Sequence, residues 1–288
     1  GNRDLNKVRL TAELSLPDLK RPIDDIPPPH WDPKAPTLRQ YLESVAAAAL
    51  EQEKKNNNNN ESGSVEESIH VNDAVELVNT RVERLKYMLI HTLGCPDTFE
   101  FRRQELAILR KCYKDVIITD EQVVDSFLHE VQNPKGSLYQ YLHHANVAAI
   151  VGNTIFVHGA IDQATMKFVP DCQSKFENPR QKPKEGQICE NVHEWVDALN
   201  NFLQVGLQDF KNRPYWNEAD DKEEARTTRG GEALMALQNR PAMWGRSIIS
   251  NCYGDGGVIT THASQKWRNT QLEEIDHPLQ FEKVCSDP

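Results

Sequence analysis

The clearest β-strand signal in this sequence is one short hairpin, which lies among segments whose apolar residues repeat with helical spacing. Residues 147–151 are apolar, Gly152 and Asn153 are typical of a two-residue turn, and residues 154–158 are mostly apolar and rich in strand-forming side chains. Strand signal is scarce elsewhere, whereas helix signal is abundant. We therefore predict an α/β fold in which an incomplete central sheet, with this hairpin buried in it, is flanked by helices.

The first half of the chain carries the strongest helix patterns. In residues 72–93 the apolar side chains step by three or four positions, which places them on one face of a single helix that Gly94 ends. Other helices are predicted over residues 38–53 and 97–113, and from residue 119 to 131. Capping pairs begin two of these helices: Asp97 with Glu100, and Thr119 with Gln122. We interpret residues 37–136 as a large helical insertion with a disordered, asparagine-rich tip at residues 51–66.

The remaining segments are assigned to the core of the fold. Residues 1–36 become rich in proline, which predicts an extended surface connection. Residues 137–288 continue the core, with helices and strands predicted at these positions: helices at 138–144, at 192–210 and near Leu234, and strands at 246–250 and 258–261.

Composition limits the class of protein. The 288 residues contain 33 basic and 43 acidic side chains, giving a net charge of −10, and 38% hydrophobic residues with a mean hydropathy of −0.65. A chain of this length is expected to form one or two domains. No apolar run approaches the roughly 18 residues of a membrane span, and the acidic balance argues against a protein that coats nucleic acid.

The cysteines and the first residue bear on compartment. The six cysteines lie far apart without a C-x-x-C pair, which argues against zinc knuckles and favours reduced thiols in a cytoplasmic setting. The chain starts at Gly1 rather than at Met, so we expect it to begin inside a longer protein, and targeting signals cannot be read from it.

Two short motifs carry candidate chemistry. The first is Gly1-Asn2-Arg3-Asp4, and the second is the strand end Ile155-Phe156-Val157-His158 followed by Gly159. An asparagine amide oxygen and a neutral imidazole are both suitable ligands for a divalent metal ion. Glycine after the histidine allows the backbone to turn sharply and present the ring at the edge of a sheet.

Together these motifs resemble the third and fourth of the five motifs of the calcineurin-like metallophosphoesterases, in the serine/threonine phosphatase-like branch. The resemblance implies hydrolysis of phosphate esters at two divalent metal ions, Mn, Fe or Zn, on a phosphorylated protein or small molecule. It assigns Asn2 and His158 as metal ligands. Arg3 stands where the family has the histidine that protonates the leaving group, and arginine cannot donate a proton at neutral pH. We therefore expect Arg3 to clamp the phosphate and Asp4 to hold its guanidinium.

The other three motifs of the family, D-x-H, G-D-x-x-D and G-H-x-H, are absent from the sequence. We expect them to lie outside this chain and the isolated chain to be inactive. Weaker candidates are the helix-ending His143 and His144, which favour a structural role, and Asp255 and His262 near the last predicted strands. Two alternatives remain open: a non-catalytic helical interaction module, and a degenerate phosphatase fold that binds a phosphorylated partner.

Overall fold

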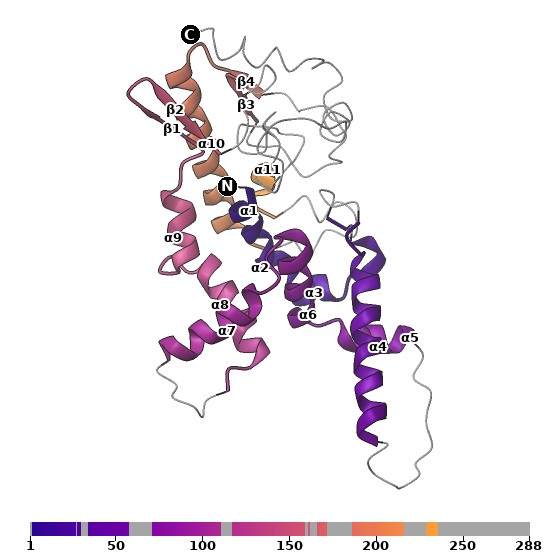
Figure 1. The fold of residues 1–288 in the computed structure, drawn as a ribbon. Helices are drawn as coiled ribbons and strands as arrows, with labels where there is room; N and C mark the ends of the chain where they lie inside the picture. The colour runs from indigo at the N-terminus through magenta and orange to yellow at the C-terminus, as the bar shows by residue number, and fades with distance from the viewer. Residues whose placement is uncertain are drawn as a thin grey trace, which may run out of the picture. The chain divides into compact units, whose positions relative to one another are not determined.

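The computed structural model describes residues 2–26, 28–29, 34–57, 71–110, 117–158, 161, 166–171, 186–215 and 229–235. The chain divides into two compact units. Unit 1 comprises residues 1–8 and 132–288, and unit 2 comprises residues 9–131 (Figure 1). Residues 9–36, which we assigned to the core of the fold from the sequence, group in the structure with the helices of unit 2.

Unit 2 is helical throughout its described part. Its elements in chain order are α2 (Leu10–Glu13), α3 (Leu16–Leu19), the 3₁₀ helix η2 (Ile23–Asp25), α4 (Leu38–Asn57), α5 (Val71–Val78), α6 (Arg81–Tyr87), the π-helical turn η3 (Met88–Thr92), α7 (Thr98–Leu109) and α8 (Asp120–Gln132). One of its apolar clusters joins η2, α4, α5 and α6 through these buried side chains: Ile23, Leu38, Leu42, Val75 and Tyr87. The expected helix over residues 38–53 is confirmed and continues to Asn57, so residues 51–57 of the predicted disordered tip are helical.

The first residues differ most from the sequence prediction. Instead of an extended surface connection, residues 2–13 form successive helical turns: α1 (Asn2–Leu5), the 3₁₀ helix η1 (Asn6–Arg9) and α2. Their apolar side chains are buried, as Val8 and Leu10 show with no exposed surface. The proline content that suggested an extended chain is concentrated after residue 21, so it did not describe the first turns.

The single helix predicted over residues 72–93 is broken at residues 79 and 80. Thr80 has an extended backbone, and its side chain accepts a hydrogen bond from the Glu83 amide, so it caps α6 as a new helix. The apolar spacing continues across the break, which is why periodicity alone predicted one helix. Gly94, at φ +65°, ends the segment as expected.

One predicted capping box is confirmed and the other is wrong. Before α8, the Thr119 amide donates to Gln122 Oε1 at 3.1 Å, and the Gln122 amide donates to Thr119 Oγ1 at 3.3 Å. Asp97 makes no side-chain cap on α7, and Glu100 pairs with Arg103 instead. Arg103 gives the Glu100 carboxylate two hydrogen bonds, at 2.9 and 3.1 Å, and Asp97 has a helical backbone (φ −81°, ψ −5°) instead of the extended one of an N-cap residue.

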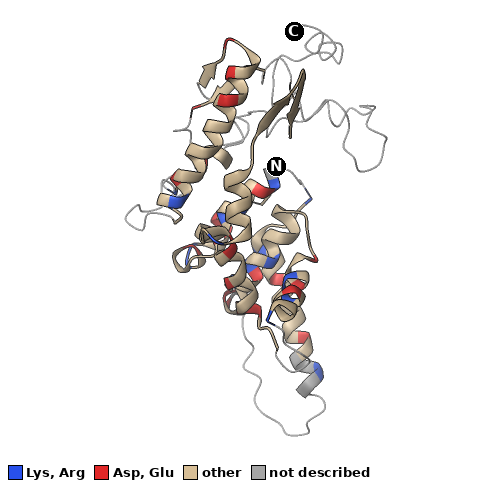
Figure 2. Ribbon diagram, turned by 90° about the vertical axis from the view of Figure 1, so that its left-hand side faces the viewer, with Lys and Arg blue, Asp and Glu red and all other residues tan. Residues whose placement is uncertain are grey.

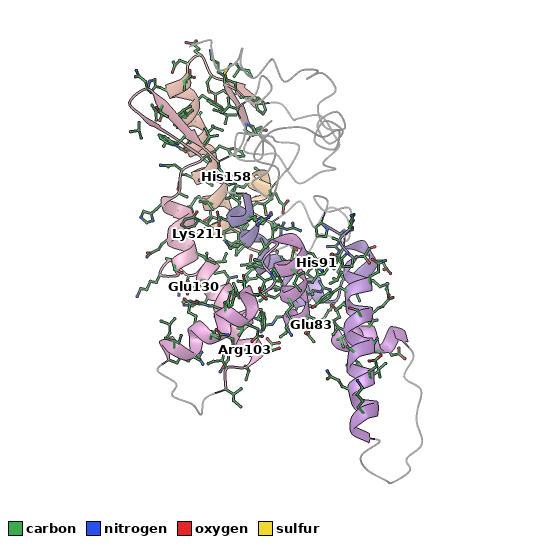
Figure 3. All side chains as sticks on the ribbon, in the orientation of Figure 1. Glu83, His91, Arg103, Glu130, His158 and Lys211 are labelled. Carbon is green, nitrogen blue, oxygen red and sulfur yellow. The ribbon has the colours of Figure 1, made fainter. Side chains whose placement is uncertain are left out.

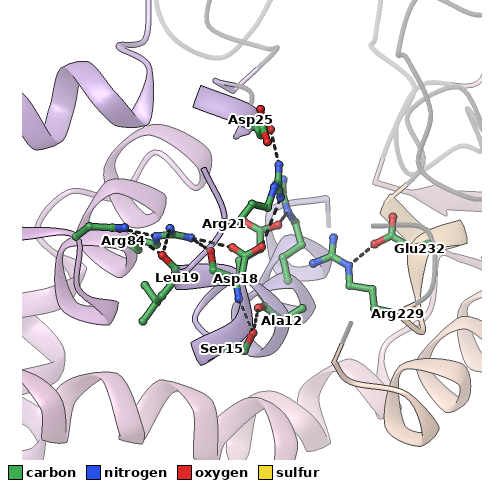
Figure 4. Close-up of polar contacts among 12 residues, drawn as sticks. Ala12, Ser15, Asp18, Leu19, Arg21, Asp25, Arg84, Arg229 and Glu232 are labelled. Atoms are coloured by element: carbon green, nitrogen blue, oxygen red, sulfur yellow. Dashed lines mark hydrogen bonds and ion pairs between the residues drawn. The ribbon is translucent and has the colours of Figure 1, made fainter. Parts of the chain in front are cut away.

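A buried arginine organises the polar interior of unit 2 (Figure 4). Arg84 is 3% exposed, and it donates to both the carbonyl and the carboxylate of Asp18 at 2.9 Å, to the Leu19 carbonyl and to Asn79. The guanidinium thereby ties α6 to α3. Acidic and basic residues are interspersed along the helices of this unit (Figure 2), and Arg103 pairs with both Glu100 and Asp120.

Unit 1 is built on the long helix α10 (Val192–Asn212). Its other described elements are α1, η1, α9 (Ser137–His144), β1 (Ala148–Val151), β2 (Thr154–Val157), β3 (Phe168–Pro170), β4 (Gly186–Ile188) and α11 (Glu232–Met235). The apolar face predicted for α10 is buried, and Trp195 and Leu199 have almost no exposed surface. Asn200 on this helix accepts from the Val147 and Ala148 amides and donates to the Ala148 carbonyl, which fixes β1 against α10.

The predicted hairpin is confirmed, but it is not buried. β1 and β2 pair antiparallel with Val151 opposite Thr154 across a turn in which Gly152 has φ +59°. Val151 and Phe156 are 66% and 57% exposed, so the described chain leaves much of the hairpin uncovered. A second antiparallel pair, β3 with β4, was not predicted because its strands are three residues long.

The mixed α/β class therefore holds at a coarse level: helices with two small antiparallel sheets. The strands predicted at residues 246–250 and 258–261 lie outside the described residues. In the part of the chain that the structure describes, no helix is long and apolar enough to cross a membrane, as the sequence predicted.

Candidate functional site

A small pocket in unit 1 brings together one residue from each of the two predicted motifs. It is lined by Asp4 and Leu5 of α1, by α9 residues Tyr141 and Leu142, by residues 145–147, by His158 after β2 and by Leu203 of α10. Its volume is about 30 Å³, which accommodates a few water-sized groups. Asp4 and His158 are far apart in the sequence, and both line this pocket because α1, α9 and the hairpin belong to one unit.

Asp4 has well-defined partners at this pocket. Its Oδ1 accepts a hydrogen bond from Lys7 Nζ at 3.0 Å, and its Oδ2 accepts one from the Tyr141 hydroxyl at 3.4 Å. Burial raises the pKa of Asp4, but a hydrogen bond from the terminal amino group of this chain, then the hydrogen bond and charge of Lys7, outweigh burial and leave the pKa below its ordinary value. The carboxylate is therefore ionised at neutral pH, which suits an orienting or charge-stabilising group rather than a proton donor.

Tyr141 is affected by the same charge. The negative charge of Asp4 raises the pKa of the Tyr141 phenol, and partial burial and the hydrogen bond act in the same direction. The hydroxyl therefore stays protonated across the physiological range and remains a donor. The Asp4–Tyr141 contact is long for an O–H···O bond, whose usual range is about 2.5–3.0 Å.

His158 lies directly after β2, as the sequence predicted, and its side chain is exposed at the wall of the pocket (Figure 3). Val157, the last residue of β2, pairs with Ala148, so His158 follows directly after the paired part of the hairpin. An imidazole in this position is accessible to a ligand or to a metal ion.

The other two predicted site residues are described less fully. Asn2 is the first residue of α1, and its side chain lies outside the described part of the structure, so its distance to His158 is not defined. Arg3 is exposed, one position before Asp4. The partners found for Asp4, Lys7 and Tyr141, were not predicted from the sequence, which assigned Asp4 to Arg3.

The donor set was tested against the metal ions that the resemblance implies. Among the described residues, no group of three or more His, Cys, Asp or Glu side chains is placed to hold a metal ion. His158 and Asp4 are chemically suitable ligands, but a catalytic zinc site normally takes three from the protein, and both Asp4 oxygens already accept hydrogen bonds. The described residues alone do not form a complete metal site.

The remaining sequence candidates divide into structural residues and residues outside the description. His143 and His144 each direct Nδ1 at the carbonyl four residues earlier, and His143 stacks on Tyr139 with ring centroids 3.8 Å apart. These contacts agree with the structural role favoured from the sequence. Asp255 and His262 lie outside the described residues.

Sequence reasoning missed the contribution of Tyr141 as a pocket residue. The helix pattern of α9 buries Tyr139 and Leu142, which leaves Tyr141 on the outer face, and an exposed tyrosine gives no signal by itself. The contact with Asp4 joins residues 137 positions apart, so only the tertiary structure shows it.

Comparisons with known proteins add no assignment: no family model, no curated protein and no solved structure matches this sequence. The site is therefore interpreted from its own residues.

Proposed function

We propose that this protein takes part in the hydrolysis of phosphate esters, as a member of the calcineurin-like metallophosphoesterases, with its site at the pocket of Asp4 and His158. The observation that carries the proposal is the shared pocket. Two motifs that the resemblance assigns to one active site, although distant in sequence, each contribute a side chain to it. A helical interaction module does not require side chains from the two motifs to line one pocket.

One cation beside the pocket supports binding of a phosphate group: Arg3, which does not line the pocket but directly precedes the lining residue Asp4 in the sequence. Arg3 is exposed next to Asp4, and a guanidinium binds a phosphate through two parallel N–H donors. Asp4 is ionised and is held by Lys7 and Tyr141, so it can orient a cationic or proton-donating group beside the substrate. In this proposal Arg3 clamps the phosphate and Asp4 is the orienting acid.

The proposed metal ions need ligands beyond the described residues. We place His158 among those ligands, with Asn2 beside it, because both belong to the metal-binding motifs of the family that the chain resembles. The exposed apolar side chains of the β1–β2 hairpin fit a larger sheet, such as the sandwich of that family, of which the described chain holds only a part.

The test is hydrolysis of p-nitrophenyl phosphate in the presence of Mn²⁺ by the protein expressed from its complete reading frame. We expect turnover that a chelator abolishes. His158→Ala and Asp4→Asn should each lower kcat/KM by roughly 100-fold or more. Matched controls are His193→Ala and Asp197→Asn on the exposed face of α10 in the same unit, which should retain the wild-type rate.

Equal losses in the pocket variants and in the control variants would contradict the proposal, as would the absence of any metal-dependent turnover. If no metal-dependent turnover is found, a second candidate function remains, and the arginine at position 3 favours it. A fold that binds a phosphorylated partner without turnover needs the phosphate-binding guanidinium but no leaving-group acid. Binding of a phosphopeptide that is lost in Arg3→Ala, without hydrolysis, would identify it.

A further inference from the structure

A second polar side chain lies at the same end of the β1–β2 hairpin as His158. Asn146 comes two residues before β1, and His158 directly follows β2. Ala148 at the start of β1 pairs with Val157 at the end of β2, so the antiparallel ladder brings the two flanking residues to one end of the hairpin. Both residues line the pocket, and neither of the two sequence motifs includes Asn146.

The Asn146 carboxamide differs from the other polar groups of the pocket in its hydrogen bonding. Asp4 accepts from Lys7 and from the Tyr141 hydroxyl. The side chain of Asn146 is exposed and forms no hydrogen bond with any residue of the described chain. Its two N–H donors and its oxygen are therefore available to a ligand in the pocket.

The backbone is held on both sides of Asn146. The Ala145 amide donates to the Leu142 carbonyl at the end of α9, at 3.3 Å, and the Val147 amide donates to Asn200 of α10 at 2.8 Å. Val147 is itself buried. A short side chain with two rotatable bonds on a fixed backbone loses little conformational entropy when it binds a ligand. The carboxamide is therefore well placed to act as a preorganised hydrogen-bonding group.

A phosphate in this pocket requires donors that offset the charge of Asp4. That carboxylate is ionised, so it repels an anionic ligand, whereas a carboxamide N–H is an uncharged donor that a phosphoryl oxygen accepts readily. We infer that Asn146 is a substrate-binding residue, whose carboxamide donates a hydrogen bond to a phosphoryl oxygen. The inference rests on the proposed function for the identity of this ligand.

The experiment compares Asn146→Ala with Asn201→Ala in the protein expressed from its complete reading frame. Asn201 is a matched control, because it is an exposed asparagine of unit 1 that does not line this pocket. The readouts are KM and kcat for p-nitrophenyl phosphate, and the Kd of inorganic phosphate from calorimetry. We expect Asn146→Ala to raise KM and Kd by about tenfold or more, with kcat within about twofold, because the bond forms in the ground state and in the transition state. Asn201→Ala should match the wild type, and the thermal midpoint should be unchanged in both variants.

A third variant, Asn146→Asp, separates the two chemistries of the carboxamide. It keeps an oxygen, which is the atom that a metal ion would bind, and it loses both N–H donors. Wild-type affinity for phosphate in Asn146→Asp or in Asn146→Ala would overturn the inference, as would an equal loss in Asn201→Ala. Weaker phosphate binding in the Asn146 variants of a protein without metal-dependent turnover would support the donor role and contradict the proposed function. Turnover with an unchanged KM and Kd in Asn146→Ala would do the reverse.

Discussion

At the scale of single residues, charge burial in unit 2 depends on complete hydrogen bonding. Arg84 is 3% exposed and Asp18 is 5% exposed. Burial lowers the pKa of the Arg84 guanidinium, and the negative charge of Asp18 acts in the opposite direction. The guanidinium remains charged because its donors meet the Asp18 carboxylate, two backbone carbonyls and Asn79. Nothing in the sequence singles out Arg84 among its basic residues, because its ion pair with Asp18 joins residues that are 66 positions apart.

Removing this arginine should therefore be costly. In Arg84→Met the Asp18 carboxylate stays buried without its main partner, and we expect the free energy of unfolding to fall by about 3–5 kcal/mol. The control is Arg81→Met on the same helix, whose pairs with Glu121 and Asp125 are largely exposed and worth less than about 1 kcal/mol. Urea unfolding measures both values. Similar losses of unfolding free energy in the two variants would contradict the claim that the buried Arg84–Asp18 pair contributes more than the exposed pairs of Arg81.

At the scale of elements, local rules predicted helix positions better than helix ends. The Thr119–Gln122 box and the glycine of the β1–β2 turn were predicted correctly, because the interacting groups are neighbours in the sequence. Asp97 was wrongly taken as a cap, because its own backbone is helical and not extended. The break before α6 was missed, because the apolar spacing continues across Thr80. The prediction that the β1–β2 hairpin is buried was also wrong, because burial depends on tertiary neighbours that a local pattern does not identify.

Helix caps give a prediction at this scale. Thr80→Ala and Thr119→Ala each remove a side-chain acceptor for a helix N-terminal amide, so each should lower the free energy of unfolding by about 1 kcal/mol. Asp97→Ala should change it by less than about 0.5 kcal/mol, because Asp97 makes no side-chain cap. Chemical denaturation of the three variants tests the assignments. A larger loss for Asp97→Ala than for the threonine variants would contradict them.

At the scale of the whole molecule, the chain divides into two compact units, and unit 2 buries a tyrosine. Tyr87 is 4% exposed and donates to the Pro36 carbonyl at 2.9 Å, and burial raises its pKa to about 12. Tyr41 lies beside it, with ring centroids 5.4 Å apart. The sequence predicted the helices of this unit but not which tyrosines face inward.

The buried tyrosine should make unit 2 sensitive to alkali. A group whose folded pKa exceeds its unfolded value of 10 stabilises fully below pH 10, and this contribution is lost as the pH rises toward 12. From the difference between the two pKa values, the loss amounts to about 3 kcal/mol. In Tyr87→Phe the dependence over this range should be weaker by about this amount, and the part that remains includes Tyr41, whose pKa is raised by burial and by Glu83. Stability measured by urea unfolding from pH 9 to pH 12 tests this, and an identical slope in both proteins would contradict it.

The site itself illustrates the limit of prediction at this largest scale. Asp4 and His158 were identified from short motifs by resemblance, and the structure places both at one pocket. Of the Asp4 partners, Lys7 is only three residues away, whereas Tyr141 is brought there by the packing of α1 and α9, which no local pattern encodes.

The central claim is that this pocket is the place of phosphoester chemistry, with His158 as a metal ligand. The most direct measurement is Mn²⁺-induced broadening of the histidine ring signals in the ¹⁵N-histidine-labelled complete protein. The account predicts that the His158 signals broaden first, at Mn²⁺ concentrations that leave His193 and His144 sharp. A sharp His158 signal under conditions that support phosphatase turnover, or equal broadening of all three histidines, would contradict it.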